Sequence, residues 1–486
     1  MSHRESKQLQ FESTPDMPKS QPLTYSQLLD PAVWSYKAEG NANVVLTYVG
    51  RDSAFFGYVL RLRKEPAAPV KSSGEDAPHI HSLDHEYAFQ RNVIGVLLGK
   101  EYVAEMQPVP MTREFLTAIG KVIDEARPQS RRGRGPDMNQ SVAPLLPDHT
   151  LMQEVFAANS VLDSSAAPPP PSAPPTVVAL ELKVEDDELF CPLDLYSGDV
   201  NRVKSALQVL CQTPQNNLRF FLDGAQYPVD NTDTRARLDL FLSGGFDKIL
   251  DLIAKILIDD PLFRVLKTRQ QSLDAYDIEW IFKWYSALAE TGKEPRDPTE
   301  EEWEAIVQDY LDEGREGPKR AVDGSISAIN ADAGSFDSGS DTEAPQPKRK
   351  RKDSTASIGS LDRHSFEPKG KRRRLDSDTD PFRDEISDAE KLHRVQLFML
   401  SVTLKDLSVI ITVDKDNNSK EEKSDQAPHL GKPMGAIRLG NESFRYKLRV
   451  VDIDPKRIDK ISHYYQLDQD IIRHFQTLKE DKRCQP

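Results

Sequence analysis

Two acidic residues and a lysine near the carboxyl end of the chain have the types and the spacing needed to handle a phosphate group. The segment reads Asp452-Ile-Asp454-Pro-Lys456, and Ile461-Ser-His-Tyr-Tyr465 follows shortly after it. Mg²⁺ in proteins is usually held by one or two carboxylates together with substrate phosphates, and a nearby lysine stabilises the charge of a phosphoryl group during transfer. The end of a strand exposed to solvent would account for the same residues, so further segments are needed to choose between the two interpretations.

A second acidic residue, Asp406, stands in the segment Lys405-Asp-Leu-Ser408, just before the apolar run 409–411. A carboxylate can act as a general base when it lies within hydrogen-bond reach of the hydroxyl group that loses its proton. An isolated segment of this kind is otherwise typical of a strand entry or a helix cap. Asp406 is therefore a candidate base, and its assignment depends on the segments that accompany it.

Three further segments carry polar residues beside predicted strands: Glu39-Gly-Asn-Ala-Asn43, Glu181-Leu-Lys183 and Pro214-Gln-Asn216-Asn217-Leu218. The first lacks both the P-loop and the GxGxxG pattern. Its small residues would let backbone N–H groups approach phosphates, but Gly-Asn is also ordinary turn chemistry, and the pattern alone favours a hairpin turn. Glu181 and Lys183 share one strand face, where a surface ion pair is the alternative interpretation.

In this order along the chain, these segments resemble the inositol-pentakisphosphate 2-kinase family, and Cys191-Pro-Leu-Asp-Leu-Tyr-Ser-Gly198 and 461–465 are the most specific matches. The resemblance covers residues 25–270 and 395–475, with gaps. It implies transfer of the γ-phosphate of ATP to the 2-hydroxyl of inositol 1,3,4,5,6-pentakisphosphate, with Mg²⁺, to give inositol hexakisphosphate. The implied fold class is α+β, a two-lobed inositol polyphosphate kinase fold with a small N-terminal sheet lobe, a larger α/β C-terminal lobe and a long disordered insertion.

The resemblance also implies roles for single residues. Asp406 is the base at the 2-hydroxyl, Lys183 lies among the substrate and transferred phosphates, and Asp452 holds Mg²⁺ with Asp454 as a second ligand or a supporting residue. The residues implied in ATP binding are Gly40, Asn41, Ala42, Asn43, Arg61 and, at the ribose, Glu181. Those implied in substrate binding are Arg127 (with Arg131 as the alternative), Asn216, Asn217, Lys456, Lys460 and Tyr464.

The last three of these residues are spaced four apart, which would place them on one helical or turn face. At Lys460 the family usually has arginine, so the charge is kept but the bidentate fork is lost. After Lys183 the family continues with a basic stretch, whereas this chain has the acidic segment 184–190. Either a segment is missing from the translated sequence, or the chain is a weakened relative that acts on a less phosphorylated inositol or serves as a non-catalytic nuclear interaction protein.

Composition restricts the class of protein. The chain has 486 residues, a formal net charge of −14 and 38% hydrophobic residues, and it contains neither an apolar signal segment nor a run long enough to cross a membrane. Its three cysteines, at 191, 211 and 484, fit a reducing compartment. A polyanionic substrate would be repelled by the average charge, so a local basic pocket must bind it.

Element patterns then divide the chain. Strands are predicted at 43–49, 55–62, 177–182, 405–413 and 446–453, and helices at 86–98, 200–210, 246–257, 278–288, 389–400 and 465–478. The predicted parts are a disordered N-terminus (1–24), the N-lobe (25–144), the first part of the C-lobe (145–312), a disordered insertion (313–386), the second part of the C-lobe (387–478) and a tail (479–486). We expect a monomer.

The insertion contains two basic clusters, 347–352 and 368–374, each with a flanking proline. Such clusters are typical of nuclear-import signals or nucleic-acid patches. No aromatic residues alternate with the basic ones, so nucleic-acid binding is not expected. These clusters predict recognition by the import machinery through 347–374 and a location in the nucleus and possibly the cytoplasm; a solvated linker is the alternative.

Overall fold

The computed structural model describes residues 25–65, 83–152, 174–183, 194–214, 217–229, 231–292, 295–316, 386–416 and 434–477. These residues form helices and two antiparallel sheets, which confirms the α+β class. Both sheets belong to one compact unit, Met1–Asp309 with Lys391–Pro486, and a second unit spans Tyr310–Glu390. The predicted disorder of 1–24, 479–486 and most of 313–386 falls outside the described residues.

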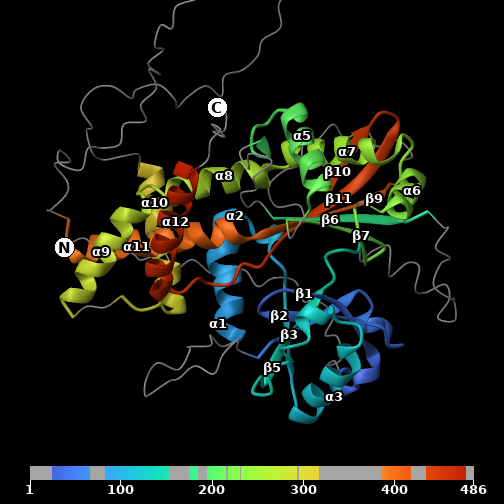
Figure 1. Ribbon diagram of the computed structural model, residues 1–486, viewed down its shortest axis with the longest axis horizontal. Coiled ribbons are helices and arrows are strands. Elements are labelled where there is room, and N and C mark those ends of the chain that lie inside the picture. The colour runs from blue at the N-terminus through green and yellow to red at the C-terminus, as the bar shows by residue number, and fades with distance from the viewer. Residues whose placement is uncertain are drawn as a thin grey trace, which may run out of the picture. The chain divides into compact units, whose positions relative to one another are not determined.

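The first sheet has five strands in the order β1-β2-β3-β5-β4 (Figure 1). Its strands are β1 Trp34–Glu39, β2 Asn43–Tyr48, β3 Tyr58–Arg63, β4 Gln107–Pro110 and β5 Val142–Pro147. The helix α3, Arg113–Asp124, begins at Thr112, whose side chain accepts a hydrogen bond from the backbone N–H of Phe115. Apolar side chains of α3 pack against those of the sheet and form one buried core.

The second sheet has six strands in the order β10-β11-β9-β6-β7-β8. They are β6 Val177–Lys183, β7 Leu218–Leu222, β8 Ala225–Tyr227, β9 Ser408–Lys415, β10 Gly435–Leu439 and β11 Glu442–Val451. The helices α5 Val200–Gln212, α6 Thr232–Phe241 and α7 Gly245–Asp259 lie along this sheet (Figure 1). Aromatic pairs join the two layers, with ring centroids 5.9 Å apart for Phe220 and Phe246 and 6.2 Å apart for Phe241 and Phe444.

The remaining helices follow the apolar periodicity of the sequence. They are α1 Leu83–Ala88, a π-helical segment Phe89–Ile94, α2 Gly95–Leu98, α8 Pro261–Leu273, α9 Ile278–Glu290, α10 Glu300–Glu316, α11 Asp388–Asp406 and α12 Ile461–Thr477. Helices α9 and α12 meet through Phe282 and Tyr465, whose rings stack 4.3 Å apart. In the described ranges, no helix has the length and apolar content needed to span a membrane.

Several predicted bounds differ from those in the structure. The predicted strand 405–413 begins too early, because the helical apolar pattern of α11 continues through Leu404 and the helix ends at Asp406. The boundary at 144/145 falls inside β5, which pairs with β3 and β4 of the first sheet. Helix α10 continues to Glu316, four residues into the predicted insertion.

Candidate functional site

Three adjacent strands of the six-stranded sheet, β6, β9 and β11, bring the predicted catalytic residues together. Ser408, at the start of β9, pairs with Lys183 at the end of β6 on one side and with Val451 at the end of β11 on the other. Asp406 lies two residues before Ser408, and Asp452 directly follows Val451. Three segments that are far apart in the sequence therefore meet at one edge of the sheet.

Two lysines hold the carboxylate of Asp406 at this edge. Lys183 Nζ lies 2.8 Å from Oδ1, and Lys456 Nζ donates to Oδ2. Burial alone would raise the pKa of Asp406, but the hydrogen bonds from Lys183 and Lys456 outweigh it and hold that pKa below its usual value. The side chain is 38% exposed, so the site presents an ionised carboxylate flanked by two cations to a ligand.

Asp452 and Asp454 lie in the segment that follows β11. Asp452 is exposed and has a φ of 59°, a left-handed conformation that residues other than glycine rarely adopt. Strained backbone of this kind is concentrated at functional sites. The carboxylate of Asp454 is engaged instead: Oδ2 lies 2.6 Å from Nη2 of Arg61, and Oδ1 accepts a hydrogen bond of 3.3 Å from Gln90 Nε2.

A metal ion at this edge of the sheet would have few protein ligands. Within the ranges that the structure describes, no three histidine, cysteine or acidic residues form a cluster suited to a metal ion. Mg²⁺ usually takes only one or two protein carboxylates and completes its shell with phosphates and water. The exposed carboxylate of Asp452 fits that mode, with Asp454 in a supporting position.

The Gly40 segment is a hairpin turn between β1 and β2, as the pattern alone predicted. The N–H of Gly40 donates to the carbonyl of Asn43 at 3.0 Å, and Lys64 N–H donates to the carbonyl of Ala42 at 2.7 Å. With its amide oxygen turned toward Arg61, Asn43 accepts two hydrogen bonds of 3.0 Å from that guanidinium. Arg61 therefore connects the turn to Asp454, and the turn's role in nucleotide binding stays a prediction.

Glu181 faces Arg219, its direct partner on β7. Arg219 Nη1 donates to both carboxylate oxygens, at 3.0 and 3.1 Å. Burial raises the pKa of Glu181, and the nearby Asp452 adds to this, while Arg219 and Lys183 oppose it without cancelling it. Arg219 lies directly after the segment 214–218 and was not among the predicted site residues, because only the strand register shows that it faces Glu181.

The predicted substrate-binding residues lie in different settings. Asn217 is buried, and its carbonyl accepts the N–H of Lys183 at 2.9 Å, which stabilises the end of β6. Lys456 precedes the short helical turn Ile458–Lys460, so the four-residue spacing does not place it on a helix face. Its contact with Asp406 brings it to the site instead. Asn216 lies outside the described residues.

Lys460 ends the short helical turn 458–460, and Tyr464 follows in the first turn of α12, within reach of the charge of Asp406. Lys460 is exposed and Tyr464 is half-buried. Burial raises the pKa of Tyr464, and the charges of Asp406 and Asp459 raise it further. The phenol is therefore protonated at neutral pH and can donate a hydrogen bond to an anionic ligand.

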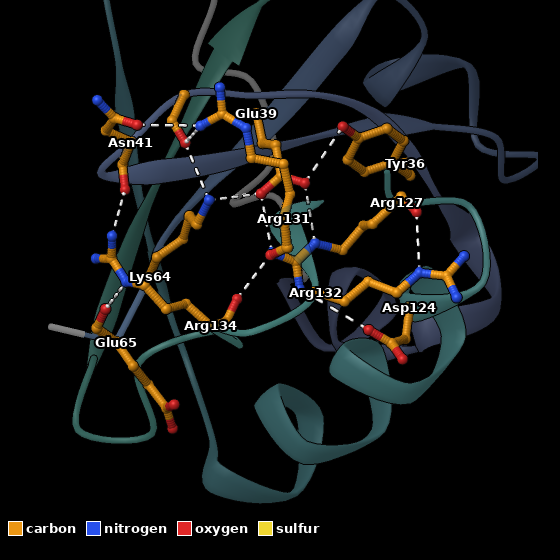
Figure 2. Close-up of polar contacts among 11 residues, drawn as sticks. Tyr36, Glu39, Asn41, Lys64, Glu65, Asp124, Arg127, Arg131, Arg132 and Arg134 are labelled. Carbon is orange, nitrogen blue, oxygen red and sulfur yellow. Dashed lines mark hydrogen bonds and ion pairs between the residues drawn. The ribbon is translucent and has the colours of Figure 1, made fainter. Parts of the chain in front are cut away.

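Arg127 does not fit the predicted contact with substrate. Its guanidinium is buried, donating to the carboxylate of Glu39 at 2.9 and 3.1 Å and to the carbonyls of Arg131 and Arg134 (Figure 2). A guanidinium with these partners has a structural role. Arg131, the alternative, lies beside the Gly40 turn and donates to Asn41 Oδ1 at 3.0 Å.

The chain is similar over most of its length to a family of known proteins. A family model described as inositol-pentakisphosphate 2-kinase matches residues 36–470. A protein of that name from Arabidopsis thaliana is 25% identical over 496 residues, covering 92% of this chain and 94% of the relative. One from Danio rerio is 24% identical over 494 residues with the same coverage, and one from Cryptococcus neoformans is 25% identical over 288 residues, covering 53% of this chain and 67% of the relative.

Proposed function

Because the chain belongs to the inositol-pentakisphosphate 2-kinase family, we propose that it transfers the γ-phosphate of ATP to the 2-hydroxyl of inositol 1,3,4,5,6-pentakisphosphate and forms inositol hexakisphosphate. The observation that carries this proposal is the carboxylate of Asp406 held between Lys183 and Lys456. The five-stranded sheet corresponds to the small lobe of a two-lobed kinase, and the six-stranded sheet with its helices corresponds to the large lobe.

Asp406 acts on the acceptor hydroxyl. Phosphoryl transfer depends mainly on positioning and on neutralising charge, and an ionised carboxylate can orient a hydroxyl group and accept its proton. Lys183 and Lys456 lie on either side of that carboxylate, so their ammonium groups stabilise the charge of the phosphoryl group in transfer. Lys460 and Tyr464 add donors for the phosphates of the inositol ring.

ATP binds between the Gly40 turn and the six-stranded sheet. The turn and Arg61 contact the phosphates, and Glu181 accepts hydrogen bonds from the ribose hydroxyls. Ala179, Phe221 and Ile410 form a buried apolar cluster, and Ala179 lies on the same face of β6 as Glu181. Asp452, supported by Asp454, would hold Mg²⁺, which when bound neutralises charge on the phosphates.

A turnover assay with ATP, Mg²⁺ and inositol 1,3,4,5,6-pentakisphosphate tests the proposal. Replacing Asp406 with Asn keeps the shape of the side chain but removes the base, so we expect kcat to fall about 10²- to 10⁴-fold. Lys405→Gln is the matched control, because the neighbouring Lys405 pairs with Asp274 and not with the site. Absence of hexakisphosphate with the wild-type chain, or equal turnover by the Asp406 variant, would contradict the proposal.

We also propose that the chain is imported into the nucleus through the basic clusters 347–352 and 368–374, which lie outside the described residues. The support is their composition, short lysine and arginine runs next to proline. Replacing the basic residues of both clusters with glutamine should abolish nuclear accumulation of a fluorescent fusion. Unchanged accumulation would contradict the import proposal and leave the kinase assay unaffected.

A further inference from the structure

A buried cluster of charges lies beneath the Gly40 turn. It consists of Glu39, Lys64 and Arg127, whose side chains are 2%, 3% and 2% exposed. Lys64 Nζ lies 2.6 Å from Oε2 of Glu39, and Arg127 donates to both carboxylate oxygens (Figure 2). We call these three residues the Glu39 cluster. The proposed function assigns no role to any of them.

Each cation of the cluster also holds a neighbouring segment. Lys64 Nζ donates to the carbonyl of Gly40 at 3.0 Å, so it supports the turn from below. Arg127 Nη2 donates to the carbonyls of Arg131 at 2.6 Å and Arg134 at 2.8 Å. Residues 128–135, here called the arginine loop, are thus held by Arg127, which pairs with the carboxylate directly before the turn.

A second set of contacts joins the turn to the arginine loop near the surface. Arg131 Nη1 donates to Asn41 Oδ1, and Arg134 Nη1 donates to the carbonyl of Asn41, both at 3.0 Å. Arg134 Nε also donates to the carbonyl of Glu65 at 2.6 Å. The turn is therefore bonded to the loop both at the surface and through the buried cluster (Figure 2).

The buried charges of the Glu39 cluster fix the geometry of their surroundings as well as filling space in the core. Apolar residues of similar volume often stabilise a core as well as a buried ion pair does, whereas loss of one partner leaves an uncompensated charge. Ionic hydrogen bonds are directional and fix geometry. Burial would raise the pKa of Glu39, but Arg127 and Lys64 hold it below its usual value, so the carboxylate is ionised at neutral pH.

We propose that Glu39 is a positioning residue for nucleotide binding: it makes the Gly40 turn and the arginine loop one rigid unit against which the ATP phosphates bind. This inference rests on the proposed role of the turn. Loss of the Glu39 carboxylate should loosen both segments together. The groups that act on the acceptor hydroxyl lie at the edge of the six-stranded sheet and should be unaffected.

The first experiment separates positioning from general stability. Glu39→Gln is expected to raise the KM for ATP about tenfold or more while kcat changes little, because the turn is displaced and the base is not. Glu39→Asp keeps the charge and should recover part of the affinity. Asp414→Asn is the matched control, since Asp414 is also a buried carboxylate, paired with Arg445 at the far end of β9. An unchanged KM for ATP with Glu39→Gln, or an equal rise with Asp414→Asn, would overturn the inference.

Hydrogen exchange on the wild-type chain tests the same coupling even where the Glu39 variant does not fold. A non-hydrolysable ATP analogue should slow amide exchange in residues 39–43 and 128–135 by similar factors. Slowing confined to 39–43 would overturn the inference.

The proposed function fails separately if the wild-type chain shows neither ATP binding nor turnover. In that case, comparing amide exchange in Glu39→Gln with the wild type tests the coupling of the two segments alone. Faster exchange in both segments supports the coupling, and faster exchange in only one rejects it.

Discussion

The acid–base properties of single residues in this site are set by neighbours that come from other segments. Asp406 is kept ionised by Lys183 and Lys456, although burial acts in the opposite direction. The pKa of Glu181 is raised instead, because burial and the charge of Asp452 outweigh the effect of Arg219. Two carboxylates at the same sheet edge therefore have pKa values shifted in opposite directions, which suits one to a role as base and the other to a role in recognition.

The raised pKa of Glu181 predicts a pH dependence of ATP binding. The carboxylate becomes protonated at a pH above the ordinary value of 4.5, and a protonated group accepts hydrogen bonds from ribose hydroxyls less well. We expect the KM for ATP to rise as the pH falls through this range. Glu181→Gln should have a higher KM at neutral pH with a weaker pH dependence.

Titration of ATP itself affects both proteins equally, so the ratio of the two KM values isolates Glu181. A ratio that does not change with pH would contradict the prediction.

The raised pKa of Glu181 also has a consequence for stability. A carboxyl group with a raised folded-state pKa destabilises the fold once it is ionised. That penalty is present at neutral pH and disappears as the pH falls below the unfolded-state pKa.

At the scale of elements, strand ends and one helix end assemble the site. Helix α11 stops at Asp406, two residues before the first residue of β9, and β11 stops immediately before Asp452. Asp452 itself has a left-handed backbone conformation. A residue there has two separate tasks, which are to adopt this conformation and to present a carboxylate.

Two substitutions at Asp452 separate those tasks. Asparagine tolerates the left-handed region, whereas alanine there costs about 1–2 kcal/mol. We therefore expect Asp452→Asn to keep the wild-type free energy of unfolding and Asp452→Ala to lose about 1 kcal/mol or more in urea denaturation. Both should lose Mg²⁺-dependent turnover, because both lack the carboxylate. Equal stability of the two variants would show that the backbone there is not strained.

At the scale of the whole compact unit, Arg61 and Lys37 are among the described residues whose polar contacts join the sheets. Arg61 of the five-stranded sheet pairs with Asp454 beside the six-stranded sheet. Lys37 of β1 donates to Asp148 at 2.7 Å, to Thr150 at 2.9 Å and to the carbonyl of Gly224, in the turn between β7 and β8, at 2.6 Å. Since ATP is proposed to bind between these sheets, both contacts affect the geometry of its site.

Loss of Lys37 should destabilise the protein strongly. Asp148 is buried, and Lys37→Met leaves its carboxylate without this cation, which costs about 3–5 kcal/mol. Urea denaturation measures the change. Lys204→Met is the control: its partner Asp247 is 62% exposed and Asp251 is partly exposed, and such pairs contribute about 1 kcal/mol or less. Similar losses for the two variants would contradict the role of Lys37 as a buried connection.

The overall charge of −14 makes the location of the cations decisive. A polyanionic inositol phosphate gains nothing from the average field of such a protein. Lys183, at the end of β6, and Lys456, in the segment after β11, meet at Asp406. Local concentration of charge, and not composition, explains how an acidic chain can bind this class of substrate.

The sequence by itself determined the family resemblance, the identity of Asp406, Lys183 and Asp452 as candidates, and the approximate positions of many helices and strands. Apolar periodicity and short motifs are local properties, so they can be read without the fold. The hairpin turn at Gly40 and the helix that begins at Val200 were predictable for this reason.

Only the tertiary structure decided which residues become partners. The family resemblance implied that Arg127 binds the substrate. The fold instead places its guanidinium beneath the Gly40 turn, where it pairs with the carboxylate of Glu39. Arg219 faces Glu181 through strand register, and Lys456 reaches Asp406 across fifty residues of chain. Such pairs depend on strand order and chain reversal, and electrostatic interactions act through space and not along the sequence. For that reason the directions in which the pKa values of Asp406 and Glu181 are shifted were settled by the fold.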